Sequence, residues 1–312
     1  MRLRESGAFG MLPATAGTLM KKYICIFVAF AAALLGHAAA ADEAADAKVK
    51  QFLDGLHFQS GTVNVSGAHA TLALTPEFRY LDAADAQKVL TQLWNNPPDT
   101  EVLGMLVPTA APLSDPARSW AVAITYSDDG HIADADAAKL DYEQMLKDMQ
   151  SSMRDANPER KKQGYSEIEL VGWAARPHYD ATANKLYWAK ELSVSDGREH
   201  ALNYDIRALG RGGYLSLNAV AGIKQFGLVE SEMQKVLAMT TFDAGARYGD
   251  FNASTDKVAA YGIGALVAGA IAAKAGLFAK LIVLLIAFKK AFVIGFLAVA
   301  AAVRKFFTRA KS

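Results

Sequence analysis

Cysteine is almost absent from this sequence of 312 residues, which contains one, Cys25. It lies in an uninterrupted apolar run, residues 23–35, near the N-terminus. If this run is removed during export, the mature chain has no thiol, and disulfides, thiolate catalysis and cysteine-based metal sites are excluded. The exported domain must then be stabilised by its core alone.

Common catalytic and metal-binding motifs are also missing. The six histidines show no HxH or HExxH spacing, and there is no GxSxG. The glycines of GRGG (210–213) lie between two predicted strands, where they suit a hairpin turn rather than a phosphate-binding loop. The acidic stretch 127–143 has Thr125 where a calcium loop needs an aspartate. We assign Asp134 and Asp136 instead to a helix N-terminus, and expect neither a metal nor a cofactor.

The formal net charge is only +1, but charge is unevenly distributed. Residues 42–255 carry 30 acidic and 20 basic side chains, whereas residues 256–312 carry nine basic and one acidic. An acidic body argues against nucleic acid as a partner. A basic tail after such a body is typical of a soluble domain joined to a segment that contacts anionic lipid.

The N-terminal segment has the features of a secretory signal peptide. Two lysines precede the apolar run, and Ala38-x-Ala40 is the small-residue pattern of a cleavage site. We predict a signal peptide over residues 1–40, cleaved after Ala40. Residues 1–19 add nothing that this signal needs, so Met20 is an alternative start. An uncleaved anchor is the other interpretation, although the run is short for a membrane span.

The body, residues 41–255, is predicted to be an α+β domain. Four runs with strand character are joined by short connections of turn residues, which require antiparallel neighbours. This predicts a four-strand antiparallel meander in the C-terminal half, at 168–175, 185–192, 201–209 and 214–220. Other strands are expected at 61–65, 69–74, 102–107 and 120–126. Flanking helices are expected at 46–56, 83–93, 134–154 and 228–239, so helices and strands are segregated.

Local signals set the expected helix boundaries. Asp82 is predicted to cap the helix over 83–93. Asn157-Pro158 is predicted to end the helix over 134–154, because proline disfavours helical geometry in the residue before it. The charged stretch 159–163 is then expected to be a solvated face or a linker.

One polar face of the meander is a candidate binding site. Apolar and polar side chains alternate along strand 201–209, so the polar ones share a face. The polar residues are Asn203, Asp205 and Arg207, and neighbouring strands offer Lys190, Glu191, Ser216 and Asn218. Such a face is either a ligand site or a solvated surface with cross-strand ion pairs. Trp173, Tyr187 and Trp188 are interpreted first as core or rim aromatics, and second as a binding platform. The candidate ligand- or partner-binding residues are Lys190, Asn203, Asp205, Arg207, Arg211, Trp173 and Trp188.

Long motifs cover nearly all of residues 50–305. They are LWNNPP (93–98), LGMLVP (103–108), GYSEIELVGWAARPHYD (164–180), KLYWAKEL (185–192), LNYDIRALGRGGYLSLNAVA (202–221) and YGDFNASTDKVAAYGIGALVAG (248–269). In these motifs the chain resembles a bacterial family of predicted membrane-anchored proteins, domain of unknown function 2167. Asn95 departs from the family, where we expect glycine after Trp94. The resemblance implies an envelope protein anchored through its C-terminus, and supplies no activity, substrate or catalytic residue.

The tail, residues 256–312, contains two apolar segments. Residues 258–273 have no charge and, extended to Phe278, are long enough to span a membrane. Residues 281–303 are apolar apart from Lys289 and Lys290. These lysines cost roughly 5–7 kcal/mol on insertion, and the apolar side chains return roughly 4–8 kcal/mol. Hydropathy therefore does not decide whether the second segment spans the membrane or lies in its interface.

Orientation favours a single span. The signal peptide places the body outside the inner membrane, and one span keeps the eight bases from Lys274 onward cytoplasmic, as the positive-inside bias requires. A two-span hairpin is the alternative. The residues that would set the orientation are Lys274, Lys280, Lys289, Lys290, Arg304 and Lys305.

The sequence does not define a biochemical role. We predict an inner-membrane protein with a periplasmic body that binds an envelope protein or ligand, is not an enzyme, and contacts membrane lipid through its tail. A hydrolase-type enzyme that uses carboxylates such as Asp205 and Glu191 beside Arg207 is one alternative. An envelope stress or signal sensor is another.

Overall fold

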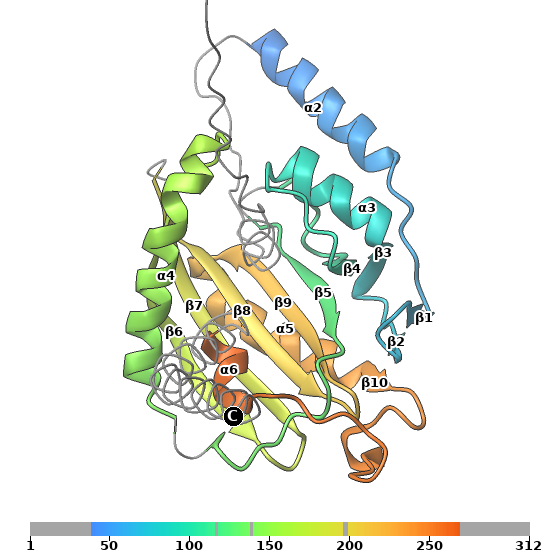
Figure 1. Cartoon of the computed structure of the whole chain (residues 1–312). Helices are drawn as coiled ribbons and strands as arrows, with labels where there is room; N and C mark the ends of the chain where they lie inside the picture. Colours follow the sequence, from blue (N-terminus) through green and yellow to red (C-terminus); the bar gives the residue numbers. More distant parts are fainter. Residues whose placement is uncertain (1–38, 116–117, 138–139, 196–198, 269–312) are drawn as a thin grey trace, which may run out of the picture.

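The computed structural model describes residues 39–115, 118–137, 140–195 and 199–268 (Figure 1). The predicted signal peptide lies almost wholly outside these ranges, as do all six residues predicted to set membrane orientation. Of the predicted span over 258–278, only residues 258–268 are described. No helix in the described ranges is long and apolar enough to cross a membrane.

The centre of the fold is a seven-stranded antiparallel sheet in the order β3-β4-β5-β9-β8-β7-β6 (Figure 1). Its strands are β3 (Phe78–Asp82), β4 (Val102–Pro108), β5 (Ala121–Ser127), β6 (Ile168–Asp180), β7 (Lys185–Val194), β8 (Ala201–Leu209) and β9 (Tyr214–Gly222). Strands β6 to β9 are consecutive neighbours, which confirms the predicted meander. The pairing of β5 with β9 joins the meander to the N-terminal strands.

The larger apolar core lies on one face of this sheet. The apolar side chains of β8 (Leu202, Tyr204 and Ile206) point into it. A short turn η3 (Ile223–Gln225) leads into α5 (Phe226–Ala238), which packs on β9 and β8. A three-stranded sheet of β1 (Thr62–Val65), β2 (Ala70–Ala73) and β10 (Thr240–Phe242) covers the rest. The predicted N-terminal hairpin and last helix are thus confirmed.

Helices cover the opposite face. They are α3 (Ala83–Lys88) with the π-helical turn η1 (Val89–Leu93), α4 (Tyr142–Lys162) along β6, and α6 (Ile263–Ala268). The N-terminal helix α2 (Ala39–Asp54) adds Phe52 and Leu53 to the cluster beneath α3. The buried α6 side chains Ile263, Leu266 and Val267 pack with residues of β7 and β8. Residues assigned to the tail by the sequence are therefore part of the packed body.

Both predicted ends of the helix over 134–154 are wrong. The helix α4 begins at Tyr142, because Asp141 caps it by accepting hydrogen bonds from the backbone N–H groups of Glu143 (3.1 Å) and Gln144 (3.0 Å). Asp134 and Asp136 precede it and do not form its first turn. At the other end, Pro158 lies inside the helix, which continues to Lys162.

Tertiary contacts hold the helix together beyond Pro158. The buried Asn157 side chain donates to the carbonyl of Ile168 (2.9 Å) and accepts from its N–H (3.0 Å), which ties α4 to the first residue of β6. Arg160 is 5% exposed and donates through Nε to the carbonyl of Ser166. These bonds offset the helical hydrogen bond that proline removes. The expectation that residues 159–163 form a solvated face or linker is therefore wrong at Arg160.

The helix predicted over 83–93 begins with the expected cap and is followed by a residue in a left-handed backbone conformation. Asp82 accepts a hydrogen bond from the N–H of Asp85 (3.0 Å), which confirms it as the N-cap. Immediately after Trp94, Asn95 has a φ of 52°, in the left-handed region. Glycine adopts this conformation readily, and asparagine is among the residues that tolerate it best. The departure from the family at Asn95 therefore preserves the turn.

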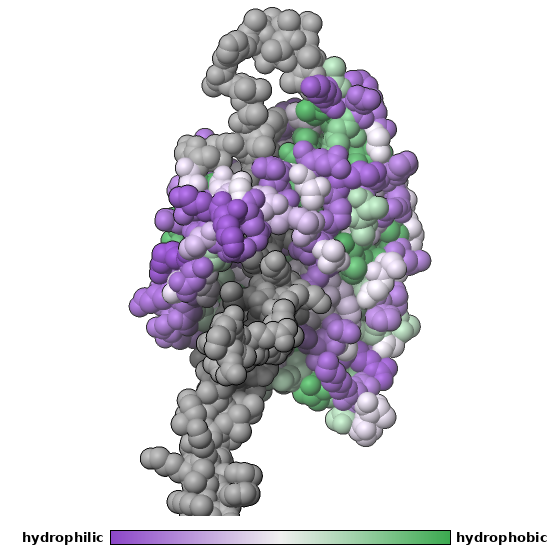
Figure 2. Space-filling model, turned by 45° about the horizontal axis from the view of Figure 1, so that its top comes forward, coloured by the Kyte–Doolittle hydropathy of each residue, from purple (hydrophilic) through white to green (hydrophobic). Residues whose placement is uncertain are grey.

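One face of the described part of the chain is largely polar. Where Figure 2 is coloured, hydrophilic residues predominate and hydrophobic residues occupy smaller areas. The large apolar side chains that are exposed in the described part (Val171, Leu228 and Val258) come from different elements. Specific recognition is therefore better sought in polar groups than in an apolar docking surface.

Candidate functional site

The predicted polar face of the meander exists and is continuous across three strands. Strand register places Lys190 opposite Asn203, and Asp205 between Trp188 and Asn218. These residues share the sheet face that is opposite to the larger core. We call the following set the polar cluster: Lys190, Asn203, Asp205, Arg207, Ser216 and Asn218.

The polar cluster is buried. Lys190 is 4% exposed and Asp205 is 2% exposed, while the Arg207 side chain is 16% exposed. The Asp205 carboxylate lies between the two cations, 2.9 Å from Lys190 Nζ and 3.2 Å from Arg207 Nη1. The alternative interpretation of this face is therefore wrong in that the face is not solvated, although the expected cross-strand ion pair does form between Lys190 and Asp205.

Hydrogen bonds inside the cluster leave several donors unused. Asn218 Nδ2 donates to Asp205 Oδ1 (2.8 Å) and to Asn203 Oδ1 (3.1 Å). Arg207 Nη1 donates to the Ser216 hydroxyl. In the part of the chain that the structure describes, three buried N–H groups around Asp205 have no partner (Asn203 Nδ2, Arg207 Nε and Trp188 Nε1), and neither does one buried acceptor, Asn218 Oδ1.

The charge of the cluster is positive. Within the described ranges, Asp205 is the carboxylate within ion-pair distance of both Lys190 and Arg207. Burial alone raises the pKa of the Asp205 carboxyl, but Lys190, Arg207 and the hydrogen bond from Asn218 outweigh it and hold the pKa below its usual range. Asp205 is therefore ionised at neutral pH. One buried and one partly buried cation then share a single negative charge.

The other predicted site residues lie apart from the polar cluster. Glu191 follows Lys190 in β7, so it points to the opposite face, where it is hydrogen-bonded to Nδ1 of His200 (2.6 Å). Arg211 forms a bidentate ion pair with Asp256 (2.7 and 2.8 Å) at the start of the tail. The hypothesis that placed Glu191 and Asp205 in one site beside Arg207 is therefore wrong, because the sheet separates the two carboxylates.

The two predicted tryptophans pack as structural aromatics. Trp188 is fully enclosed, and the guanidinium of Arg207 lies 5.0 Å from the centre of its ring. Trp173 is half-buried and donates from Nε1 to the carbonyl of Tyr142, at the first turn of α4 (3.2 Å). The interpretation as core or rim aromatics holds for both. Trp188 is also part of the polar cluster's wall, through its unpartnered Nε1.

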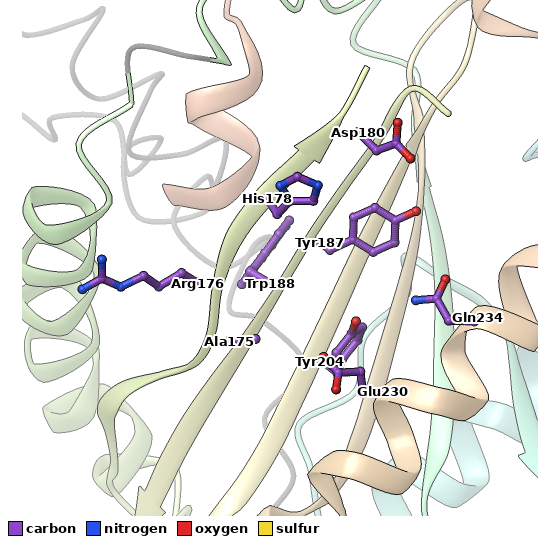
Figure 3. A pocket seen from close by; sticks show the side chains of 9 residues that line it. All are labelled: Ala175, Arg176, His178, Asp180, Tyr187, Trp188, Tyr204, Glu230 and Gln234. Carbon is purple, nitrogen blue, oxygen red and sulfur yellow. The ribbon is translucent and has the colours of Figure 1, made fainter. Parts of the chain in front are cut away.

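A cleft of about 310 Å³ lies on the other face of the same strands (Figure 3). It is lined by Ala175, Arg176, His178, Asp180, Tyr187, Trp188, Tyr204, Glu230 and Gln234. Figure 3 shows Tyr187 and Tyr204 projecting from the sheet towards the α5 residues Glu230 and Gln234. Sequence reasoning missed this site. Alternation could have placed the two tyrosines on one face, but not the position of α5 over β8 and β9.

The acidic stretch after β5 holds the beginning of the tail. Asp136 accepts a hydrogen bond from the N–H of Ile263 (3.1 Å), at the start of α6 rather than of α4. Asp129 accepts from the hydroxyl of Tyr261, and Asp134 from the hydroxyl of Tyr179. Across the described residues, no group of three or more histidines and acids is positioned to hold a metal.

A neighbouring aromatic stack adds to this junction. The ring of His131 lies against Phe251 (3.8 Å between ring centres) and Tyr248 (4.3 Å). Its backbone forms a parallel bridge with Val258. Desolvation by burial lowers the pKa of His131, although Asp134 and Asp256 oppose this effect. A neutral imidazole is the form that suits this aromatic stack. His131 therefore helps to attach the start of the tail by packing and backbone hydrogen bonds rather than by an ion pair.

Together these features define an α+β domain with a buried polar cluster on one face of its sheet and an open cleft on the other. The chain belongs to the family described as "Protein of unknown function (DUF2167)", which matches residues 57–300. A comparison with curated proteins finds no match.

Two solved structures are similar to part of this chain. One is the solution structure of cyanobacterial PsbP (CyanoP) from Synechocystis sp. PCC 6803, with 12% identity and a TM-score of 0.32 over 60% of this chain and 92% of that one. The other is the Saccharomyces cerevisiae Ran-binding protein Mog1p, with 10% identity and a TM-score of 0.31 over 61% of this chain and 98% of that one. Both TM-scores are low, so neither likeness extends to function.

Proposed function

We propose that this chain is an extracytoplasmic binding domain, and that the polar cluster receives an anionic group of its ligand, a carboxylate or a phosphate. The observation that supports this most directly is the charge of the cluster. The buried Lys190 and the partly buried Arg207 share one carboxylate, and three N–H donors around it are unpartnered. A bound anion would supply both the missing charge and the missing acceptors.

Folding alone does not account for such a cluster. A buried ion pair is often no more stabilising than apolar side chains of the same size, because desolvation cancels its Coulomb energy. Each unpartnered buried donor costs about 1–3 kcal/mol. Groups kept in a fold at such a cost are candidates for a function. Access is nearest to Arg207, whose side chain is the most exposed charged member.

The same geometry favours binding over acid–base catalysis. Glu191 lies on the other face of the sheet and is engaged with His200. Asp205 is held ionised by its two cations, which makes it a poor proton donor at neutral pH. A general acid and base pair beside Arg207 is thus not available from these two residues, and we do not propose the hydrolase-type alternative further.

Binding of an anion should be visible at the indole N–H of Trp188. In the isotope-labelled full-length protein, we expect titration with inorganic phosphate or with acetate to shift the Trp188 Nε1–H resonance in a saturable way. Arg207→Gln should weaken this response about tenfold or more, since a charge-assisted bond contributes about 1.5–3 kcal/mol. The Trp188 Nε1–H resonance is identified by its absence from the spectrum of the Trp188→Phe variant.

Arg118→Gln is the matched control, because Arg118 is exposed and pairs with Asp115 on the surface. It should leave the titration unchanged. A response to phosphate but not to acetate, or the reverse, identifies the source of the anionic group. If neither anion shifts the Trp188 signal at concentrations up to about 50 mM, any binding is far weaker than a functional site requires. Water then fills the cluster and the proposal is wrong.

We further propose that the domain is held at the outer face of the inner membrane by its tail, with a single span and a cytoplasmic C-terminus. Support comes from the predicted signal peptide, the apolar segments and the eight bases of residues 274–311. Because Ile263, Leu266 and Val267 pack against the sheet, residues 258–268 belong to the body in this fold, and the proposed span must be formed by residues beyond 268.

Single cysteines test this topology, since the chain has only Cys25 to remove. In a Cys25→Ala background, Ser151→Cys lies on the exposed side of α4 and Ser312→Cys at the C-terminus. When intact spheroplasts are treated with a membrane-impermeant maleimide, we expect labelling at position 151. Position 312 should be labelled only after lysis. Labelling of position 312 without lysis would rule out the single span, and protection of position 151 would rule out an outer location.

A further inference from the structure

The cleft beside α5 contains a buried side chain with an unused polar group. Tyr204 is 4% exposed and its ring packs in the larger core, 6.4 Å from the ring of Phe226. In the described part of the chain its hydroxyl has no hydrogen-bond partner, yet it lines the cleft. Phenylalanine would fill the same core position without a hydroxyl to satisfy. The hydroxyl is not among the buried atoms without a partner, so it is open to the cleft and available to water or to a ligand there.

The cleft is negatively charged. Glu230 on α5 and Asp180 at the end of β6 both line it, and among the described residues no cation lies within ion-pair distance of either. Arg176 also lines it, but its guanidinium is paired with Glu143 of α4 (2.6 Å). Figure 3 shows the Arg176 side chain directed towards α4, away from the two tyrosines. The positive charge nearest to the cleft is thus already neutralised.

The titration of the tyrosines reflects this environment. Burial raises the pKa of Tyr204 to about 12, and the nearby Glu230 carboxylate adds to the shift. Burial and the Asp180 carboxylate raise the pKa of Tyr187 in the same way. Both phenols are therefore neutral at physiological pH, with oxygen lone pairs available to a donor.

We propose that this cleft is a second binding site, which takes a ligand bearing an ammonium group. An ammonium ion has three N–H donors and a positive charge. The cleft offers acceptors on Tyr187, Tyr204 and Gln234, the Glu230 carboxylate, and two aromatic rings that favour a cation. Its volume of about 310 Å³ is at the lower end for ligand sites, which suits a compact amine or amino sugar.

This site does not depend on the proposed anion site. The sheet lies between the two, so each can be removed by a substitution that leaves the other intact. The probes are putrescine and glucosamine, with N-acetylglucosamine as the neutral counterpart of the second. Binding to the full-length protein is measured by calorimetry.

We expect both amines to bind and N-acetylglucosamine not to bind. Glu230→Gln should weaken amine binding about fivefold, the upper range for an exposed ion pair. Tyr204→Phe should weaken it about tenfold without loss of stability, since only a hydroxyl is removed. Glu232→Gln is the control on the same helix, because Glu232 pairs with Lys235 and does not line the cleft.

The outcomes separate clearly. Equal binding of glucosamine and N-acetylglucosamine, or amine binding that Glu230→Gln leaves unchanged, would overturn the ammonium site. So would the absence of binding by either amine. Arg207→Gln should leave putrescine affinity unaltered, and this result would hold even if the polar cluster proved to bind no anion.

Discussion

Replacing Asp205 by asparagine is expected to lower the free energy of unfolding by about 3–5 kcal/mol, the range for removing one partner of a buried ion pair. Asparagine has nearly the same shape, so packing is preserved. The change leaves the buried Lys190 and the partly buried Arg207 with no carboxylate between them. In urea unfolding followed by tryptophan fluorescence, the midpoint should fall by more than about 1 M.

Two further variants test whether charge is the cause. Asp54→Asn removes an exposed partner of Lys50 and should shift the midpoint very little, because surface pairs contribute about 0–1 kcal/mol. Adding Lys190→Met to Asp205→Asn should recover part of the lost stability by removing one unpaired cation. Equal midpoints for Asp205→Asn and Asp54→Asn would show that the buried carboxylate does not stabilise the fold.

The effect should depend on pH in a defined direction. The pKa of Asp205 is lower in the folded than in the unfolded chain. Its stabilising contribution is therefore fully present above the unfolded pKa, about 3.9, and is lost as the pH falls below it. The difference in midpoint between the native chain and Asp205→Asn should thus narrow below about pH 4. A constant difference between pH 7 and pH 3 would contradict the assigned charge.

Replacing Gly213 by alanine is expected to prevent stable folding or to cost more than about 4 kcal/mol, the upper end of single-substitution effects. A Cβ atom at Gly213 would lie 1.7 Å from the carbonyl oxygen of Ser127 and 2.8 Å from its carbonyl carbon. Both atoms belong to the backbone of β5, which is paired with β9 at this point. No side-chain rotation can relieve the contact, so the strands must separate.

Two other glycines provide controls for this result. Gly212 is the neighbour in the same turn, where a Cβ would meet only the Tyr126 hydroxyl at 3.8 Å, so Gly212→Ala should change stability by less than about 1 kcal/mol. Gly227 lies in α5 with open space around it, and Gly227→Ala should stabilise by up to about 1 kcal/mol. Urea midpoints compare the three. A Gly213→Ala midpoint close to that of Gly212→Ala would show that β5 and β9 are not packed this closely.

The meander was predictable because its information is local. Connections such as the one at 210–213 are too short for any arrangement but antiparallel neighbours. Alternation then assigns Asn203 and Asp205 to one face and Tyr204 to the other. The same rule, applied strictly, also separates Glu191 from Lys190. Treating these two neighbours as one polar group led to the incorrect pairing of Glu191 with Asp205.

The errors arise where distant contacts outweigh local preference. Pro158 is a helix-breaking signal in the sequence, but the two hydrogen bonds between Asn157 and Ile168 hold the helix in place. Asp136 is a reasonable residue for the first turn of a helix, and it does bond to a helix start. That helix is α6, which lies 127 residues later in the chain.

The sequence by itself determines the α+β class, the meander, the polar face that carries Asp205 and the membership of a family. These follow from turn length and from the two-residue repeat of a strand, which act between near neighbours. Only the tertiary structure decides that this face is buried, because burial depends on contacts with parts of the chain that are distant in sequence. The cleft at Tyr204 is decided in the same way, since it exists only where α5 lies over β8 and β9 and leaves the space beside β7 open.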